Sequence, residues 1–318
     1  MSTPAPPARL STTSEGLWLT AALAGVSQLP PVLKVRPIGA VAATLSDHPG
    51  VAVLEQAGVC RGGGLDGDVA EWVATLGRPD VELDVVVSRP ETAPTTLAGP
   101  PSPFEAPIDT IQAAEALTRW HAQRPPQRAV ALCRRAGVWV AAARLWRSGN
   151  DSIDEVVISP LGSASIATTV CSVLGASQPA QFHGINVEAA TLEPLVARWQ
   201  ADPGSDIVAA LIEVAGLSVP QAKVIQAAGD ATATRAVLGA AQFSIDGPCW
   251  APLGVTVIDT VLGRVVISNA MGPDARQWTT VLPGTDSAVA TAVDELLDSL
   301  PCGPGWVTHQ RTTEFDAR

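Results

Sequence analysis

The sequence predicts an α+β fold with a central, mostly antiparallel sheet on which helices pack. Strand-like segments occur in runs, and the turns between them are too short for the crossovers that parallel strands need. Helix-periodic segments flank these runs, and the second half of the chain repeats the order of elements of the first. Of the 318 residues, 47% are hydrophobic and 16% are charged, so the chain can bury a large core and is not disordered as a whole.

The first half is expected to open with short helices. Residues 1–13 combine prolines with small residues and are expected to form a flexible tail, as are residues 312–318. Ser14 is a candidate N-cap for a first helix, which Pro30-Pro31 would end. The further elements expected before residue 80 are an edge strand at Val32–Arg36, a helix that opens at His48-Pro49-Gly50 and a helix that Asp66 or Asp68 caps.

The segment 81–87 alternates acidic and apolar residues with the period of a strand. The residues expected on the buried face are Val81, Leu83, Val85 and Val87. The carboxylates of Asp80, Glu82 and Asp84 then share the other face. Carboxylates at this spacing can serve acid–base catalysis, but they more often mark a solvated sheet face, and we favour the second interpretation.

A Pro-rich segment between Ser88 and Gln127 separates this strand from the next ones. It holds one helix-periodic run, which includes Ile108, Ile111 and Trp120. Loops of this size are uncommon in compact proteins and are usually functional, mobile or both. Because Trp120 lies far in sequence from the sheet pattern, it is a candidate contact residue, although it would equally well anchor its own loop.

The remaining elements form two similar series. In the first half, three strands and a helix are expected at 129–134, 138–146, 153–159 and 164–174. In the second half, three helices are expected between Val187 and Gly229. They are followed by strands at 232–246, 253–260, 264–269 and 277–282 and by a helix at 287–300.

The two series indicate pseudo-repeats over residues 14–176 and 187–300. The segments that follow Pro160 and Pro283 carry small and apolar residues at matching positions. Such matches also arise by chance in a chain rich in Ala, Val and Thr. If the halves share one sheet, they form a single domain over residues 14–311.

Charge, hydropathy and cysteine spacing exclude several kinds of partner and site. The formal charge is −11 and the basic residues form no run longer than Arg134-Arg135, so nucleic-acid binding is not expected. The apolar stretches are too short to cross a bilayer and no secretory signal pattern is present, so we expect a cytoplasmic protein without membrane insertion. The five cysteines form no close pair and are expected to be reduced and mostly buried.

Motifs of catalytic or cofactor chemistry are weak. The segment 62–67 satisfies G-x-G-x-x-G, but the preceding segment is helical, and Asp66 and Asp68 would lie where a pyrophosphate must bind. The four histidines are not at metal-ligand spacing, and Cys133 lies on an apolar strand where an inert thiol is expected. We therefore expect no cofactor, no metal and no catalytic residue.

Many short motifs follow one another along the chain in a distinctive order. They are Gly16-Leu17-Trp18, Val35-Arg36-Pro37, His48-Pro49-Gly50, Val69-Ala70-Glu71-Trp72, Arg78-Pro79-Asp80-Val81-Glu82-Leu83, Val130-Ala131-Leu132-Cys133-Arg134-Arg135, Val257-Ile258-Asp259-Thr260, Gly263-Arg264, Pro283-Gly284-Thr285, Leu300-Pro301 and Trp306. Their order and spacing resemble the EspG family, the secretion-associated chaperones of mycobacterial and related type VII (ESX) systems. The resemblance runs from about Gly16 to Arg311 and contains no single diagnostic signature.

The resemblance implies a central antiparallel sheet, two helical bundles, quasi-twofold related halves and no cofactor. Members of the family hold the hydrophobic tip of the PPE subunit of PE/PPE heterodimers, keep the dimer soluble and present it to its own ESX secretion system. The implied function is therefore that of a cytoplasmic chaperone whose partner is a PE/PPE heterodimer. Whether the free protein forms a homodimer is left open.

The family's contact surface uses the sheet, a loop between two strands of the first half and the second helical bundle. By position these are the Pro-rich segment, Arg89 to Gln127, and the helices within Leu192–Gly229. The candidate partner-binding residues are Phe104, Ile108, Ile111, Trp120, Val219, Pro220 and Val224. A charge at Val219 or Val224 is expected to weaken binding and to leave stability nearly unchanged. The long Pro-rich segment and Ala136 depart from the family's pattern.

Two other functional classes remain open. An enzyme of unknown reaction on a duplicated antiparallel sheet would need a pocket with clustered polar residues. A structural component of the secretion complex would need membrane association, which the acidic composition does not favour.

Overall fold

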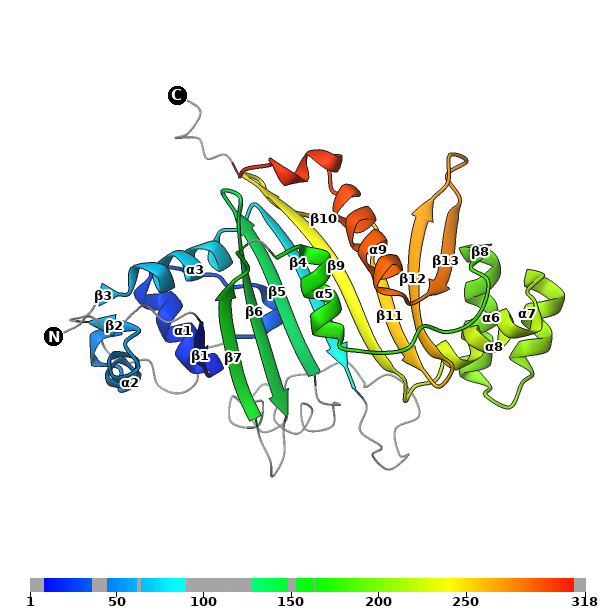
Figure 1. Cartoon of the computed structure of the whole chain (residues 1–318), viewed down its shortest axis with the longest axis horizontal. Coiled ribbons are helices and arrows are strands. Elements are labelled where there is room, and N and C mark those ends of the chain that lie inside the picture. The colour runs from blue at the N-terminus through cyan, green and yellow to red at the C-terminus, as the bar shows by residue number, and fades with distance from the viewer. Residues whose placement is uncertain are drawn as a thin grey trace. The chain divides into compact units, whose positions relative to one another are not determined.

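The computed structural model describes residues 9–35, 45–61, 64–89, 112, 127–147, 153–162 and 164–311 (Figure 1). The expected α+β class is confirmed, and the pairs of named strands whose register is defined are all antiparallel. The chain divides into two compact units, Met1–Glu82 with Glu91–Ser163, and Leu83–Pro90 with Ala164–Arg318. Whether residues 14–311 form the expected single domain stays a prediction.

The first unit combines four antiparallel strands with short helices. The strands lie in the order β1-β7-β6-β5, with bounds Leu10–Thr12 (β1), Gln127–Arg135 (β5), Val138–Arg147 (β6) and Ile153–Pro160 (β7). The helices are α1 (Ser14–Leu23), α2 (Gly50–Gln56) and α3 (Gly67–Gly77), with 3₁₀ turns η1 (Pro31–Leu33) and η2 (Leu45–Asp47) and a small hairpin of β2 (Cys60–Arg61) and β3 (Gly64–Leu65). Their apolar faces form one core, in which Leu17, Val73 and Ile158 are fully buried.

Local caps explain where these helices begin. The Thr13 hydroxyl accepts a hydrogen bond from the N–H of Gly16 and so caps α1, one residue before the expected Ser14. The Asp66 carboxylate accepts from the N–H groups of Asp68 and Val69 and caps α3, as expected. This carboxylate occupies the helix N-terminus that a pyrophosphate would need.

Two expectations for the N-terminal part are wrong. Residues 10–12 of the expected tail form β1, whose Leu10 is only 4% exposed because it packs into the core. The expected edge strand at Val32–Arg36 is replaced by η1 and by a left-handed Lys34, with φ 48°. Pro30-Pro31 favours this turn, and the carbonyls of Leu33 and Lys34 accept hydrogen bonds from Arg144 rather than from a neighbouring strand.

Strand β4 (Val81–Ser88) carries a further correction. The alternation is confirmed for the buried side chains Val81, Leu83, Val85 and Val87. The expected solvated face is wrong for two of the three carboxylates, since Asp80 is 4% and Glu82 is 2% exposed. The Asp80 carboxylate accepts a hydrogen bond of 2.8 Å from the N–H of Ala136, in the hairpin between β5 and β6.

The second unit is a larger antiparallel sheet with helices on both faces. Its strands are β8 (Ile185–Glu188), β9 (Thr234–Ser244), β10 (Gly247–Trp250), β11 (Val255–Thr260), β12 (Gly263–Met271) and β13 (Gln277–Pro283). Their order is β9-β11-β12-β13-β8, and β10, which was not expected as a separate strand, folds back on β9. The helices are α5 (Ile166–Leu174), α6 (Ala189–Ala201), α7 (Ile207–Ala215), α8 (Val219–Ala228) and α9 (Asp286–Asp298), and a 3₁₀ turn η3 (Gly303–Val307) follows.

Arg264 on β12 holds this unit together near the end of α5. Its guanidinium is buried, pairs with both carboxylate oxygens of Asp259 and donates to the carbonyls of Leu174 and Gly175 at the C-terminus of α5. A cation at a helix C-terminus is favoured by the helix dipole. Helix α5 also packs on α9. The quasi-twofold relation between the halves of the chain stays a prediction.

Candidate partner-binding surface

Helices α6, α7 and α8 form a bundle on one face of the second unit's sheet (Figure 1). The bundle's core is built by the apolar side chains that recur at helical spacing, among them Leu195, Leu211 and Ile225. From the sheet, Ile258, Val265 and Val281 join the same core. These three residues identify the sheet face under the bundle, which we call the bundle face.

The junction between α7 and α8 is fixed by backbone and side-chain hydrogen bonds. Gly216 ends α7 in the left-handed conformation, with φ 68°, which costs glycine little. Gln221 Oε1 accepts from the N–H and the hydroxyl of Ser218, and Gln221 Nε2 donates to the carbonyls of His183 and Gly184. The first turn of α8 is therefore held against the chain that precedes β8.

Exposed apolar side chains lie on both sides of this junction in the chain. Val214 is 59% exposed, Val219 is 51% exposed and Ile212 is 38% exposed, and Pro220 is exposed beside Val219. We call these four residues the junction residues. They lie on a rigid helical frame, and apolar side chains presented in this way are typical of a surface that another protein covers.

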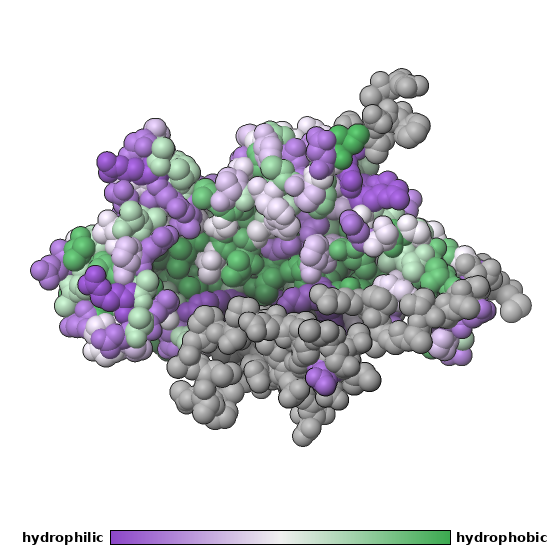
Figure 2. All heavy atoms as spheres, turned by 180° about the vertical axis from the view of Figure 1, so that it is seen from behind, coloured by the Kyte–Doolittle hydropathy of each residue, from purple (hydrophilic) through white to green (hydrophobic). Residues whose placement is uncertain are grey.

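The bundle face of the sheet also carries exposed apolar side chains beyond the bundle. Val237 on β9 pairs with Thr256, which shares the bundle face with Ile258, and Val237 is 53% exposed. Ala241, four residues further along β9, pairs with Trp250, which is 49% exposed. The space-filling view in Figure 2 shows apolar side chains (green) exposed among more polar ones. We call Val237 and Trp250 the sheet residues.

The structure divides the sequence-predicted contact residues into three groups. Val219 and Pro220 are exposed, as a contact role requires. The expectation that a charge at Val224 leaves stability unchanged is wrong, because Val224 is only 3% exposed and belongs to the bundle core. Phe104, Ile108, Ile111 and Trp120 lie outside the described residues.

Sequence reasoning missed four members of this surface. Ile212, Val214 and Val237 lie in segments that were expected to be helix or strand, and apolar residues in such segments are normally core. Trp250 lies between two expected strands, where no element was expected. The available signal was composition, since α7 is apolar on every side except at Glu213. A helix that is apolar all round either is buried or presents apolar surface.

Polar groups at the other end of the bundle keep α8 in place against the sheet. Hydrogen bonds from the backbone N–H of Thr232, and then from its hydroxyl, hold the pKa of the Asp230 carboxyl below its usual value. Burial lowers the pKa of Arg235, which still donates to the carbonyls of Ala228 and Asp230 just beyond α8. These groups have structural roles in the bundle.

The described residues offer little for catalysis or metal binding. Burial raises the pKa of the Cys60 and Cys171 thiols, so both are poor nucleophiles at neutral pH. Cys60 and Cys133 are buried as expected, whereas Cys249 is exposed. Within the described ranges, no three His, Cys, Asp or Glu side chains come together as a metal site, and no helix is long and apolar enough to cross a membrane.

Comparison with known proteins assigns the family. A model of the EspG family matches residues 13–102 and 110–295. The chain belongs to the EspG family. The match includes the bundle, the junction residues and the sheet residues.

EspG relatives cover nearly the whole chain. The ESX-5 secretion-associated protein EspG5 of Mycobacterium marinum is 26% identical over 309 residues, which cover 93% of this chain and 95% of the relative. The ESX-2 secretion-associated protein EspG2 of Mycobacterium tuberculosis is 27% identical over 320 residues, with 95% and 99% covered. The solved structure of the type VII secretion system chaperone EspG5 of M. tuberculosis, in complex with the PE25–PPE41 dimer, has the same fold, with a TM-score of 0.71 at 21% identity over 93% of this chain and 98% of that chain.

Proposed function

We propose that this chain is a type VII secretion chaperone that binds a PE/PPE heterodimer, keeps it soluble and directs it to an ESX secretion system. The observation that carries the proposal is membership of the EspG family, one of whose members has been solved with a PE–PPE dimer bound. The chain acts by binding, in the cytoplasm, and catalyses no reaction.

The contact on the partner is the hydrophobic tip of the PPE subunit. An exposed apolar helical tip aggregates unless another surface covers it, and the cover needs apolar side chains held on a rigid frame. The junction residues and the sheet residues supply such side chains within one unit, on α7, α8, β9 and β10. We propose that they contact the tip. Phe104, Ile108, Ile111 and Trp120 of the Pro-rich segment stay proposed contacts as well.

Co-expression tests the proposal. The chain is co-expressed with each PE/PPE pair of its own genome, and we expect one or more pairs to co-elute with it as a ternary complex in gel filtration. The matched control is Val219→Asp, which is expected to fold and to give less complex. Failure of every pair to co-elute with the wild-type chain would contradict the proposal.

A further inference from the structure

A groove runs between helix α9 and the strands β11, β12 and β13, on the sheet face opposite the bundle face. Val255 and Val266 line it, and they alternate along their strands with Thr256 and Val265, which belong to the bundle face. The volume of the groove is about 470 Å³, within the range of roughly 300 to 1,000 Å³ that is typical of binding pockets. A molecule bound here leaves the junction residues and the sheet residues uncovered.

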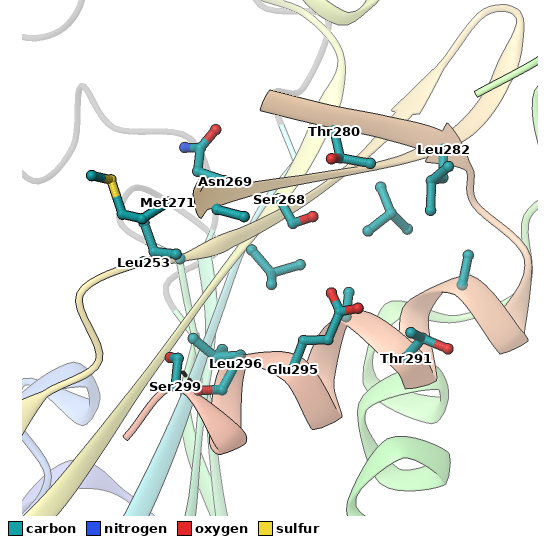
Figure 3. A pocket seen from close by; sticks show the side chains of 16 residues that line it. Leu253, Ser268, Asn269, Met271, Thr280, Leu282, Thr291, Glu295, Leu296 and Ser299 are labelled. Atoms are coloured by element: carbon teal, nitrogen blue, oxygen red, sulfur yellow. Dashed lines mark hydrogen bonds between the residues drawn. The ribbon is translucent and has the colours of Figure 1, made fainter. Parts of the chain in front are cut away.

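Small residues on α9 create the groove. Ala288 and Ala292 line the groove at positions where larger side chains would fill the space. Leu296 lines it near the end of the helix (Figure 3). At the edges, Leu282 is 37% and Met271 is 57% exposed. The groove is thus an open trough in which apolar edges flank polar side chains such as Ser268, Asn269 and Thr280. Such an open, mixed surface suits a segment of another protein better than a small molecule that needs an enclosed pocket.

The backbone of the groove determines how a segment can bind. Each of β11, β12 and β13 is already paired on both sides, so an extended peptide finds no free strand edge here. A helix satisfies its own backbone hydrogen bonds and can dock through side chains alone. On this side the lining runs from Ala288 on α9 to Ser299, the residue that follows the helix, which is about 16 Å or three helical turns.

Charge determines the chemistry of the occupant. Glu295 projects from α9 toward the strands, and it is the one charged residue among the described residues that line the groove (Figure 3). No cation of the described chain lies within ion-pair distance of Glu295. Helix α9 also carries Asp286, Asp294 and Asp298 and contains no Lys or Arg. An occupant with basic side chains complements this wall.

We propose that the groove binds a basic amphipathic helix of a second protein partner, separate from the PE/PPE dimer. About three turns of that helix would place apolar side chains against the exposed Met271 and Leu282, with a Lys or Arg against Glu295. Because the two surfaces lie on opposite faces of one sheet, the chain can hold cargo and this second partner at the same time.

A stapled model helix tests the groove. The probe is a fluorescein-labelled helix of about four turns, with leucines at i, i+3, i+4 and i+7 and lysines elsewhere, and its binding to the full chain is measured by fluorescence anisotropy at physiological ionic strength. We expect Glu295→Lys to weaken binding about fivefold or more. Asp294→Lys, the matched charge change on an exposed position that does not line the groove, is expected to weaken it less than about twofold. Thr291→Trp, which fills the groove from its exposed rim without a change of charge, is expected to weaken it at least as much as Glu295→Lys.

Several outcomes would overturn the proposal. Equal weakening by the two lysine variants, or equal binding of a scrambled peptide of the same composition, would mean that only the net charge of −11 attracts the probe. If the Thr291→Trp variant bound the model helix as tightly as the wild-type chain does, the helix would have to bind outside the groove. Binding of dodecylamine that depends on Glu295, without binding of the helix, would assign the groove to a small cationic amphiphile. The test is independent of PE/PPE binding, so the two proposals fail separately.

Discussion

At the scale of single residues, exposure separates two valines of one helix. Val219 and Val224 both lie on α8, but Val219 is 51% exposed whereas Val224 is 3% exposed inside the bundle core. A contact residue must be accessible, so Val219 can serve a partner and Val224 serves the fold. The same substitution at the two positions therefore has different consequences.

We expect Val224→Asp to lower the free energy of unfolding by about 3 kcal/mol or more, because it buries a carboxylate that has no partner. Val219→Asp, the control, is expected to change it by no more than about 0.5 kcal/mol. Urea unfolding of both variants measures the difference. Similar losses at the two positions would contradict the assignment of Val224 to the core and of Val219 to the surface.

The burial of a side chain could be predicted where it follows from a local pattern of apolar residues. It could not be predicted where it depends on a hydrogen-bond partner far away in the chain. Alternation along 81–87 correctly predicts the burial of Val81, Leu83, Val85 and Val87. The burial of Asp80 could not be predicted, because its hydrogen-bond donor, the N–H of Ala136, lies 56 residues away. This contact is not visible in the sequence because the two residues are far apart in the chain. The carboxylate itself gives no sign of it.

At the scale of elements, Arg264 connects strand β12 to the end of helix α5. Its side chain is 3% exposed and makes charge-assisted hydrogen bonds to Asp259 and to two carbonyls of the helix terminus. Arg276 offers a comparison in the same unit, because it pairs with Glu188 and Asp274 while 59% exposed. Burial distinguishes the two arginines.

We expect Arg264→Leu to lower the free energy of unfolding by about 3 kcal/mol. The substitution leaves the Asp259 carboxylate without its cationic partner and removes the hydrogen bonds to the C-terminal carbonyls of α5. Arg276→Leu is expected to cost about 0.5 kcal/mol or less, as is usual for an exposed ion pair. Chemical denaturation of both variants checks this. If Arg276→Leu proved as costly as Arg264→Leu, the role given to Arg264 would not hold.

Most elements could be predicted because their signals are local. Helix caps at Thr13, Asp66 and Ser165 lie within one residue or so of positions that the sequence indicates. The failure at residues 32–36 has a tertiary cause, because Arg144, more than 100 residues away, holds two carbonyls of that segment in a turn. Strand β10 was missed because the expected strand was extended through the two-residue turn at Ile245-Asp246, and the segment after it was not recognised as the second arm of a hairpin.

At the scale of the whole molecule, the partner surface could be only partly predicted. Two of the four junction residues, Val219 and Pro220, were expected from the sequence, while neither sheet residue was. The exposure of the sheet residues depends on how the bundle packs on the sheet. That packing joins segments far apart in the chain, so it cannot be predicted from local patterns. The family could be predicted from the order and spacing of many short motifs, and the fold class from runs of strands joined by short turns.

The most direct test of the central claim measures whether the chain shields apolar surface on its cargo. Light scattering follows the aggregation of a co-eluting PE/PPE pair as the chain is added in increasing ratio. We expect the wild-type chain to suppress aggregation with an end point near one chain per dimer, and a folded Val219→Asp, Trp250→Asp double variant to suppress it much less. Aggregation that is unaffected by the wild-type chain, or equally suppressed by the double variant, would contradict the account.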